Sequence, residues 1–180
     1  MTAHGFAVFP TAIGHCGIAW HERGIVGCCL PEATADRTRD RLRRHHPGAA
    51  ELAPPPPVAE TIDAVTALLR GERADLSAAV LDLTGVPEFH RRVYEIARTI
   101  APGATLTYGE IAHRLGEPGA ARAVGRALGN NPFPPIVPCH RVLAAGGRTG
   151  GFSATGGTAT KLRMLSIENA HSAEPTLFDL

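Results

Sequence analysis

The chain has 180 residues, of which 44% are hydrophobic and 19% are charged, and its formal net charge is +1. This composition suits one domain, or two small ones, with a real hydrophobic core. No apolar run approaches the ~20 residues that a membrane-spanning helix needs. The N-terminus lacks a basic segment followed by a long apolar stretch, so we expect no signal peptide.

The cysteines indicate the cellular compartment of the protein, and the distribution of charge indicates the kind of partner it binds. The four cysteines show no CxxC spacing and no disulfide-rich pattern, which favours a reducing, cytoplasmic location. Residues 1–87 carry 8 Lys+Arg against 10 Asp+Glu, whereas residues 88–170 carry 10 against 5. A basic second half indicates a polyanionic partner. An ordinary mixed surface explains the charge equally well.

The first half begins with a pattern that is typical of strands. Two apolar runs, Ile13–Trp20 and Ile25–Leu30, flank a polar turn that contains Gly24, which predicts a β-hairpin. A charged segment at 34–48 then predicts a helix that ends before Pro47.

Beyond that helix, a run of four prolines at 54–57 forms a stiff connection. Apolar residues recur at helical spacing from Val58 to Leu69, and Gly71 ends this predicted helix. The segment 78–83, AAVLDL, has the pattern of another strand. The sequence Gly-Val-Pro at 85–87 is the best domain boundary.

The second half is predicted to be helical. The residues Phe89, Val93, Ile96 and Ile100 give one apolar helix face. A Thr cap followed three residues later by Glu, in the segment 107–110, forms a capping box that opens a short helix. A further helix follows in the segment AARAVGRALG, so the pair has a helix-turn-helix pattern. That pattern alone is weak, because many pairs of helices share it.

The second helix of this pair has an unusual composition. Its small residues would let the backbone approach another molecule closely, and Arg122 and Arg126 lie four residues apart, on one face. These arginines would then meet phosphates or bases. Tight helix packing with solvated arginines explains the pattern about as well. The small residues are Ala121, Ala123, Gly125 and Ala127.

Cys139 is the candidate nucleophile, in the stretch NNPFPPIVPCHRV. A thiol attacks only as thiolate and needs a base or a cation nearby. His140 is adjacent, but neighbouring side chains diverge in an extended segment, so we expect a water to link the two. Glu168 is a candidate to orient His140, which would complete a triad by role. Buried packing is the usual fate of a lone cysteine, and a cysteine hydrolase fits the same spacing.

The segment TYGEIAHRLGEPGAARAVGRALGNNPFPPIVPCHRVLAAGGRTGGFSATGG resembles the O6-alkylguanine-DNA alkyltransferase family, also called methylated-DNA–protein-cysteine methyltransferases. PCHRV is similar to the active-site signature of that family, and the TYG, AARAVG and NP elements match in order and spacing. The resemblance covers residues 89–168. The first half resembles the family only loosely, through its hairpin and helices.

The resemblance implies a role for each matching residue. Cys139 would accept the alkyl group, His140 would be the water-linked base, and Glu168 the carboxylate behind it. Asn131 would be the hinge between the helix pair and the active-site segment. Arg122 would fill the gap left by a flipped base, and Tyr108 would crowd the 3′ phosphate and donate to the guanine ring. The carbonyls of Cys139 and Val142, the N–H of Ser153, and the neighbouring Pro138 and Phe152 would form the substrate pocket.

The expected fold class is α/β (α+β). A small ribonuclease H-like sheet-plus-helix domain at 1–86 would precede a helical, winged helix-turn-helix-like domain at 87–170 that binds DNA and accepts the alkyl group. A flexible tail would occupy 171–180. Leu177 and Phe178 in this tail resemble a peptide that docks on the bacterial sliding clamp, although a tail folded back on the protein is the more favoured interpretation. We expect a monomer without membrane contact.

The resemblance also implies single-turnover repair of O6-methylguanine in duplex DNA, with no cofactor. Two departures affect the pocket: Phe152 stands where many relatives have tyrosine, and SATGG carries extra residues. Some relatives bind zinc, but Cys16, Cys28, Cys29 and the histidines show no ligand spacing, so we predict no metal. A lesion-binding relative without reaction is the main alternative, although such relatives lack the reactive cysteine.

Overall fold

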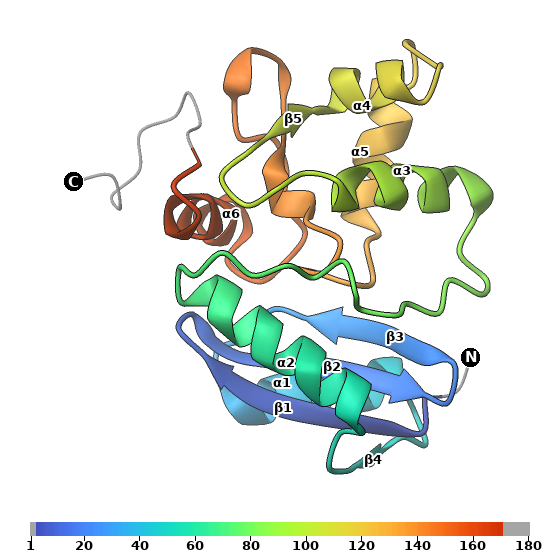
Figure 1. Cartoon of the computed structure of the whole chain (residues 1–180), viewed down its shortest axis with the longest axis vertical. Coiled ribbons are helices and arrows are strands. Elements are labelled where there is room, and N and C mark those ends of the chain that lie inside the picture. Colours follow the sequence, from blue (N-terminus) through green and yellow to red (C-terminus); the bar gives the residue numbers. More distant parts are fainter. Residues whose placement is uncertain (1–2, 171–180) are drawn as a thin grey trace. The chain divides into compact units, whose positions relative to one another are not determined.

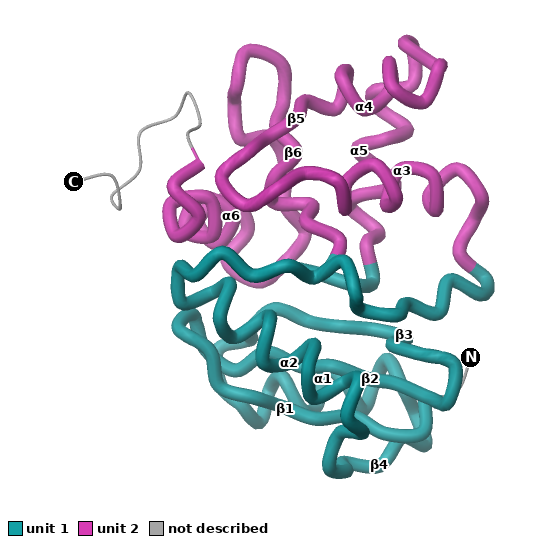
Figure 2. Tube along the Cα trace, viewed as in Figure 1, with its two compact units in different colours: residues 1–85, 132–136 teal, residues 86–131, 137–180 magenta. Residues whose placement is uncertain are grey.

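The computed structural model describes residues 3–170. The tail with its predicted clamp-docking residues, Leu177 and Phe178, lies outside the described residues. The chain divides into two compact units (Figure 2). The first unit comprises residues 1–85 and 132–136, and the second comprises residues 86–131 and 137–180.

The first unit is built on a four-stranded sheet with the strand order β3-β2-β1-β4 (Figure 1). Antiparallel pairing joins β1 (Gly5–Thr11) to β2 (Gly14–His21), and β2 to β3 (Gly24–Cys29). The short strand β4 (Ala50–Glu51) lies parallel to β1. The predicted hairpin is therefore confirmed as β2–β3, and Gly24 takes the positive φ of 139° that its turn requires.

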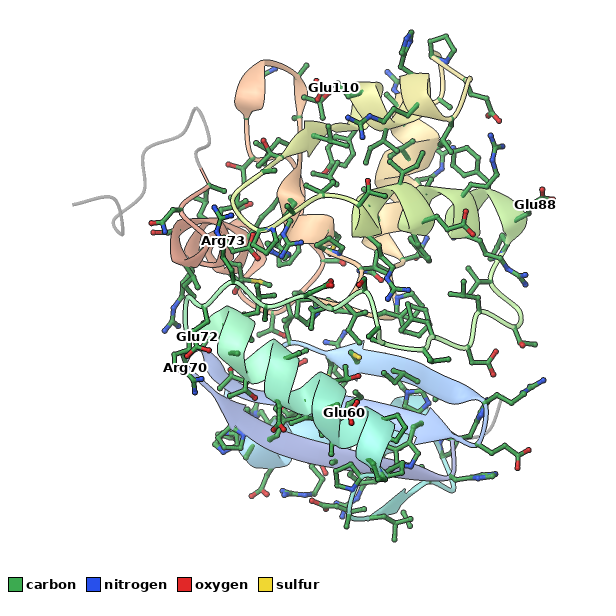
Figure 3. The ribbon with its side chains drawn as sticks, viewed as in Figure 1. Glu60, Arg70, Glu72, Arg73, Glu88 and Glu110 are labelled. Carbon is green, nitrogen blue, oxygen red and sulfur yellow. The ribbon has the colours of Figure 1, made fainter. Side chains whose placement is uncertain are left out.

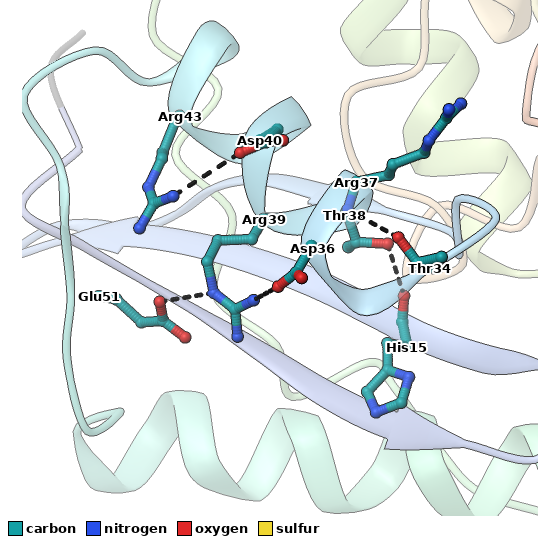
Figure 4. A network of polar contacts seen from close by, with 9 residues as sticks. All are labelled: His15, Thr34, Asp36, Arg37, Thr38, Arg39, Asp40, Arg43 and Glu51. Carbon is teal, nitrogen blue, oxygen red and sulfur yellow. Dashed lines mark hydrogen bonds and ion pairs between the residues drawn. The ribbon is translucent and has the colours of Figure 1, made fainter.

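The helix α1 (Ala35–His45) forms in the charged segment, as predicted. Thr34 caps it by accepting a hydrogen bond from the Arg37 backbone N–H at 3.2 Å, and Thr38 donates to the carbonyl of His15 in β2 at 3.0 Å (Figure 4). Arg39 of this helix also pairs with carboxylates, as do Arg41 and Arg43. The pairs are Arg39–Asp36, Arg39–Glu51, Arg41–Glu32 and Arg43–Asp40.

The helix α2 (Pro56–Leu69) follows, with a proline in its first turn. It buries the predicted apolar face, and the backbone ends the helix at the cap residue Arg70. Arg70 pairs with Glu72 at 2.7 Å, where Figure 3 labels both side chains.

The predicted strand at 78–83 is wrong. Only an isolated parallel bridge joins Ile25 to Leu81 in this segment. Asp82 explains why: its side chain accepts the Thr84 backbone N–H at 2.9 Å, which turns the chain after a single bridge. The segment covers part of the β3 edge without becoming a fifth strand.

The second unit contains four helices within the described residues: α3 (Glu88–Arg98), α4 (Tyr108–Arg114), α5 (Ala121–Gly129) and α6 (Gly157–Ile167). It also contains a short parallel pair of strands that the sequence did not reveal, β5 (Leu106–Thr107) and β6 (Val142–Leu143). Two short 3-10 turns, η1 (Cys139–Arg141) and η2 (Ala145–Gly147), flank β6.

Local contacts position the two helices before the active-site segment. The capping box at α4 is confirmed, because Thr107 accepts the Glu110 N–H at 3.1 Å and Glu110 accepts the Thr107 N–H at 2.6 Å. Figure 3 labels Glu110 at this helix start. The buried hydroxyl of Tyr94 in α3 donates to the carbonyl of Ala127 in α5 at 2.8 Å. The apolar face of α3 and this bond hold α5 in the core of the unit.

The short segment 132–136 counts with the first unit, although the residues on either side of it count with the second. The backbone N–H of Cys28 in β3 donates to the carbonyl of Pro132 at 2.8 Å. No sequence pattern predicts that this segment returns to the first unit. The fold as a whole is mixed α/β with small sheets and helices, and within residues 3–170 no helix is long and apolar enough to cross a membrane.

Candidate active site

Cys139 begins the 3-10 turn η1 directly after Pro138, and its side chain is buried. Burial raises the pKa of the thiol above its usual value. A hydrogen bond from Asn131 and the charge of Lys161 act in the opposite direction and stabilise the thiolate. Asn131 also donates to the carbonyl of Val137 at 2.8 Å. It therefore links the chain directly after α5 to the residues that lead into Cys139.

His140 and Arg141 share one carboxylate beside the thiol. The Nε2 atom of His140 lies 2.8 Å from Glu168 Oε1, and Arg141 donates to both oxygens of Glu168, at 2.8 and 2.9 Å. Arg141 also donates to the carbonyl of Ile100 at 2.7 Å. Glu168 caps the end of α6, so the helix brings a residue 28 positions away to His140.

The charges in this group stabilise one another. Burial of Glu168 would raise its pKa, but the hydrogen bonds from His140 and Arg141 outweigh burial and hold the pKa at about 2. Burial lowers the pKa of His140, although the hydrogen bond and the charge of Glu168 act to raise it. A neutral His140 beside an ionised carboxylate carries its proton on Nε2. Its Nδ1 atom is then a buried base, and among the described residues it has no hydrogen-bond partner.

A cavity of about 470 Å³ opens beside the thiol. Its walls come from the start of α4, the second half of α5, and the loop before α6. Tyr108 is half-buried there, and burial raises the pKa of its phenol. The residues that line the cavity are Tyr108, Gly125, Leu128, Gly129, Cys139, Gly151, Phe152 and Ser153.

A side-chain hydrogen bond spans two of these walls. Ser153 donates from its hydroxyl to the carbonyl of Gly129 at 3.0 Å, which joins the loop before α6 to the end of α5. The thiol, the aromatic ring of Tyr108 and this hydrogen-bonded pair of segments thus border the cavity. It has the size and mixed lining of a small-molecule site.

The structure brings most of the predicted residues into or beside this cavity. Pro138, directly before Cys139, and Val142, three residues after it, are buried but do not line the cavity. Arg122 and Arg126 are exposed on α5, and the small residues Ala121, Ala123 and Gly125 on that helix are half-buried. The arginines are therefore available to a partner, and Gly125 is both small and part of the cavity wall.

Sequence reasoning missed Arg141 and Lys161. Arg141 lies inside the quoted PCHRV segment, so its position was visible, but only the fold shows that it pairs with Glu168. Lys161 had a clearer signal, because it is the one lysine among the 18 basic residues of the sequence. Its side chain is fully buried and donates to the carbonyl of Val142 at 2.6 Å.

The other cysteines lie in the first unit. Cys16 and Cys29 are buried, Cys28 is partly covered, and all of them are free thiols. Burial raises the pKa of Cys16 to about 12 and that of Cys29 to about 11. Within residues 3–170, no group of three or more His, Cys, Asp or Glu side chains is arranged to hold a metal ion.

Comparison with known proteins decides the family. Residues 88–170 match the family described as 6-O-methylguanine DNA methyltransferase, DNA binding domain. The methylated-DNA–protein-cysteine methyltransferase of Mycobacterium bovis is 41% identical over 175 residues, which cover 97% of this chain and 98% of the relative. The chain belongs to the methylated-DNA–protein-cysteine methyltransferase family.

Two further relatives extend the comparison to DNA. The Mycobacterium tuberculosis alkyltransferase OGT, solved in complex with DNA, shares 33% identity and a TM-score of 0.74 over 92% of each chain. A DNA base-flipping protein of Thermus thermophilus is 43% identical over 108 residues, which cover 60% of this chain and 71% of that protein. The family therefore includes a protein named for base flipping as well as proteins named for alkyl transfer.

Proposed function

We propose that this methyltransferase repairs O6-alkylguanine in duplex DNA by transferring the alkyl group to Cys139. The observation that carries the assignment of Cys139 is its position: the thiol lines a cavity and is bonded by Asn131, beside the buried pair of His140 and Glu168. The thiolate sulfur attacks the alkyl carbon, a C–S bond forms, and the C–O6 bond breaks with its electron pair going to guanine. The guanine takes up one proton. No cofactor is needed for this balance.

The proton of the thiol goes to His140. Its Nδ1 is the atom that has a lone pair, because Nε2 donates to Glu168. A water molecule between Sγ and Nδ1 would carry the proton, since adjacent side chains do not face each other directly. The Glu168 carboxylate then stabilises the imidazolium, and Arg141 holds that carboxylate in place. The thioether product has no route back to a thiol, so each molecule reacts once.

The base is recognised by the backbone around the cavity. The carbonyls of Cys139 and Val142 accept from the exocyclic amine of guanine, and the N–H of Ser153 approaches O6. Tyr108 supplies the proton that the leaving guanine needs, and its phenolate regains a proton from solvent as the imidazolium of His140 releases one. Burial raises the pKa of its half-buried phenol, so the hydroxyl is protonated at neutral pH and gives up its proton only as negative charge develops on the guanine.

Entry of the base requires that the nucleotide leaves the DNA stack. Extrusion costs on the order of a few kcal/mol, and Arg122 on the exposed face of α5 would fill the gap. Small residues along this helix allow close approach to the minor groove, where wedge-and-bend binding is common. We therefore interpret α4 and α5 as a helix-turn-helix of the winged type, and the first unit as a ribonuclease H-like sheet domain, in a protein that acts as a monomer.

Two other functions can be distinguished from alkyl transfer by whether the protein becomes alkylated. A lesion-binding protein that does not react is favoured by the base-flipping relative, but the presence of Cys139 in the cavity opposes it. A cysteine hydrolase uses the same thiol–histidine–carboxylate group, but the exposed arginines and small residues of α5 have no role in it. Both alternatives predict that the protein keeps its mass after meeting the lesion.

The test is intact-mass measurement after mixing the protein with a duplex oligonucleotide that contains O6-methylguanine. We expect one methyl group per protein, and peptide mapping should place it on Cys139. Parallel reactions with O4-methylthymine and with bulkier O6 adducts would define the substrate range. An unchanged mass would contradict repair, and a methyl group on another cysteine would contradict the site.

A further inference from the structure

The turn between α4 and α5, residues 116–119, is exposed at every position. A segment without buried side chains is not held in place by packing. The helix that follows, α5, begins directly after Ala120, and no side chain caps its first turn. The position of the start of α5 therefore depends on the hydrogen bonds that reach this turn.

Backbone hydrogen bonds attach the turn to the helix on each side of it. The N–H of Gly116 donates to the carbonyl of His113 at 2.9 Å. The N–H of Glu117 donates to the carbonyl of Ala112 at 3.0 Å, which completes a Schellman motif at the end of α4. On the other side, the carbonyl of Glu117 accepts the N–H of Ala120 at 2.9 Å. Glu117 therefore connects the end of one helix to the start of the next.

A side chain from a third helix reaches the same turn. The guanidinium of Arg92 in α3 donates to the carbonyl of Leu115 at 2.7 Å and to the carboxylate of Glu117 at 3.0 Å. Leu115 is the C-cap of α4, where a carbonyl has no donor within its own helix. Arg92 thus satisfies the end of α4 and at the same time holds the residue whose backbone positions the start of α5.

The helix α3 also holds α5 at a second place, nearer its end. The hydroxyl of Tyr94 donates to the carbonyl of Ala127, and this bond is buried. The part of α5 that lines the cavity begins at Gly125, whereas Arg122 lies in its first turn. Loss of the Arg92 contacts would therefore release the half of α5 that carries Arg122, and Tyr94 would still hold the half that lines the cavity.

The pair of Arg92 and Glu117 is suited to orientation more than to stability. The two side chains are 41% and 48% exposed, and ion pairs this exposed contribute little to stability because water screens them. The guanidinium is planar, however, and its donors have a fixed geometry. It reaches both acceptors at once only while Leu115 and Glu117 keep one arrangement, so the contact selects one position of the turn.

We propose that Arg92 is a positioning residue for DNA binding, which holds the start of α5 in the orientation that presents Arg122 to the duplex. This inference rests on the proposed function, because that function assigns α5 to the DNA. If the turn loosens, only a fraction of the molecules keeps the binding-competent orientation. The apparent affinity for duplex DNA then falls by that fraction, while the reacting thiol is unaffected.

The experiment compares three changes at the turn with one matched control. Arg92→Met removes both contacts, Arg92→Lys keeps the charge without the planar fork, and Glu117→Ala removes one acceptor. The control is Arg91→Met, which changes the neighbouring exposed arginine of α3. Arg91 also donates to a backbone carbonyl, that of Val86 at 2.7 Å, but Val86 precedes α3 and lies outside the turn.

Each variant is measured in two forms. With Cys139→Ser added, so that no transfer takes place, the affinity for a duplex containing O6-methylguanine is measured at several salt concentrations. With Cys139 intact, the readouts are the transfer rate at saturating duplex and the rate at which iodoacetamide modifies Cys139. The melting temperature of every variant is measured alongside.

For Arg92→Met we expect the affinity for the duplex to fall by about three- to tenfold. The iodoacetamide rate and the transfer rate at saturating duplex should match those of wild type, because the cavity half of α5 stays in place. Arg92→Lys should lie between wild type and Arg92→Met. Combining Arg92→Met with Glu117→Ala should weaken binding no further, since loss of Arg92 already breaks both contacts. Arg91→Met should bind like wild type.

Wild-type affinity in Arg92→Met would overturn the proposal. A log–log salt slope flattened by about 0.9 in Arg92→Met would also overturn it, because the arginine would then contact a phosphate directly. Equal weakening in Arg91→Met would mean that the lost positive charge matters and the turn does not. If wild-type protein gains no methyl group while Arg92→Met still binds the duplex less tightly, the proposed function fails but the positioning role stands. Should Arg92→Met not fold, Arg92→Lys decides, and wild-type affinity in that variant would overturn the proposal.

Discussion

Each of the two units contains a histidine and an arginine that share one carboxylate, but the two groups differ in what their histidine can do. In the first unit, His21 Nε2 lies 2.6 Å from Asp82, and Arg23 lies 3.6 Å from the same carboxylate. In the second, His140 and Arg141 share Glu168 in the same way. The difference is the other ring nitrogen. His21 Nδ1 accepts the backbone N–H of Arg23 at 2.9 Å, whereas among the described residues His140 Nδ1 has no partner.

The arginine-rich helices differ in a corresponding way. In α1, Arg39, Arg41 and Arg43 pair with carboxylates of their own unit, and Figure 4 shows the pairs of Arg39 and Arg43. In α5, Arg122 and Arg126 are exposed, and within residues 3–170 neither makes an ion pair. A group whose partners are all internal stabilises the fold, while a group with one side left open is available for chemistry or binding. The predictions below test this distinction.

The largest effect is expected for Cys139→Ser. A serine hydroxyl is far less acidic than a thiol, so transfer should become undetectable while lesion binding persists. Intact mass and a DNA-binding assay on the same sample measure both properties. The thiols of the first unit, with pKa values of about 12 for Cys16 and about 11 for Cys29, should stay unmethylated in wild type. Methyl transfer by the Ser variant would remove Cys139 from its role.

The second prediction compares Glu168→Gln with Asp82→Asn. Removing the Glu168 charge leaves Arg141 buried without its anion, which costs about 3–5 kcal/mol, and it also deprives the developing imidazolium of its partner. Transfer should slow by about 100-fold, within the usual contribution of acid–base groups. Asp82→Asn should lower the melting temperature but leave transfer unchanged at temperatures well below unfolding. Equal loss of transfer in both variants would mean that stability alone limits the rate.

Much of this arrangement could be predicted from the sequence, because it depends on local patterns. The capping box at Thr107, the apolar face of α3 and the PCHRV segment are all contiguous signals. The residues alone made Glu168 a candidate partner for His140, and the resemblance implied the same pairing. The role of Arg141 was missed because its bonds reach Ile100 and Glu168, 41 and 27 residues away. The prediction of a strand at 78–83 was wrong, because the spacing of apolar residues does not reveal that Asp82 bonds to Thr84 and turns the chain.

The third prediction concerns the exposed arginines. Arg122→Ala should slow repair in duplex DNA by about 10–100-fold, since a wedge offsets part of the few kcal/mol needed to unstack a base. Reaction with free O6-benzylguanine should change little, because no stack has to be opened. Arg44→Ala, at an exposed position of α1, is the matched control and should affect neither substrate. Equal loss on both substrates in Arg122→Ala would indicate a folding defect instead of a lost wedge.

The fourth prediction is the pH dependence of stability. The pKa of Glu168 is about 2 in the folded protein, below its ordinary value of 4.5. A lowered carboxyl pKa adds stability that is present above the unfolded value and is lost as the pH falls toward the folded value. The difference in unfolding free energy between wild type and Glu168→Gln should therefore shrink between pH 4.5 and about 2. Urea denaturation at several pH values measures it, and a constant difference would contradict the assigned pKa.

The smallest effect is expected for Ser153→Ala, which tests whether a hydrogen bond at the cavity rim selects substrates. Ser153 joins the loop before α6 to the carbonyl of Gly129 at 3.0 Å, and both residues line the cavity. Thr38 makes a bond of the same length to His15 in the first unit, where it only joins a helix to a strand.

An exposed hydrogen bond contributes about 0.5–1.5 kcal/mol, so opening the rim should favour bulky adducts by about 2–10-fold. The alanine variant keeps the backbone N–H that we propose as the contact to O6, so this contact should be unaffected. The measurement is the ratio of transfer rates for O6-benzylguanine and O6-methylguanine in the same duplex. Thr38→Ala should lower the melting temperature and leave this ratio unchanged. If the ratio is the same in Ser153→Ala and wild type, the rim does not limit adduct size, and the volume beside Phe152 becomes the feature that sets it.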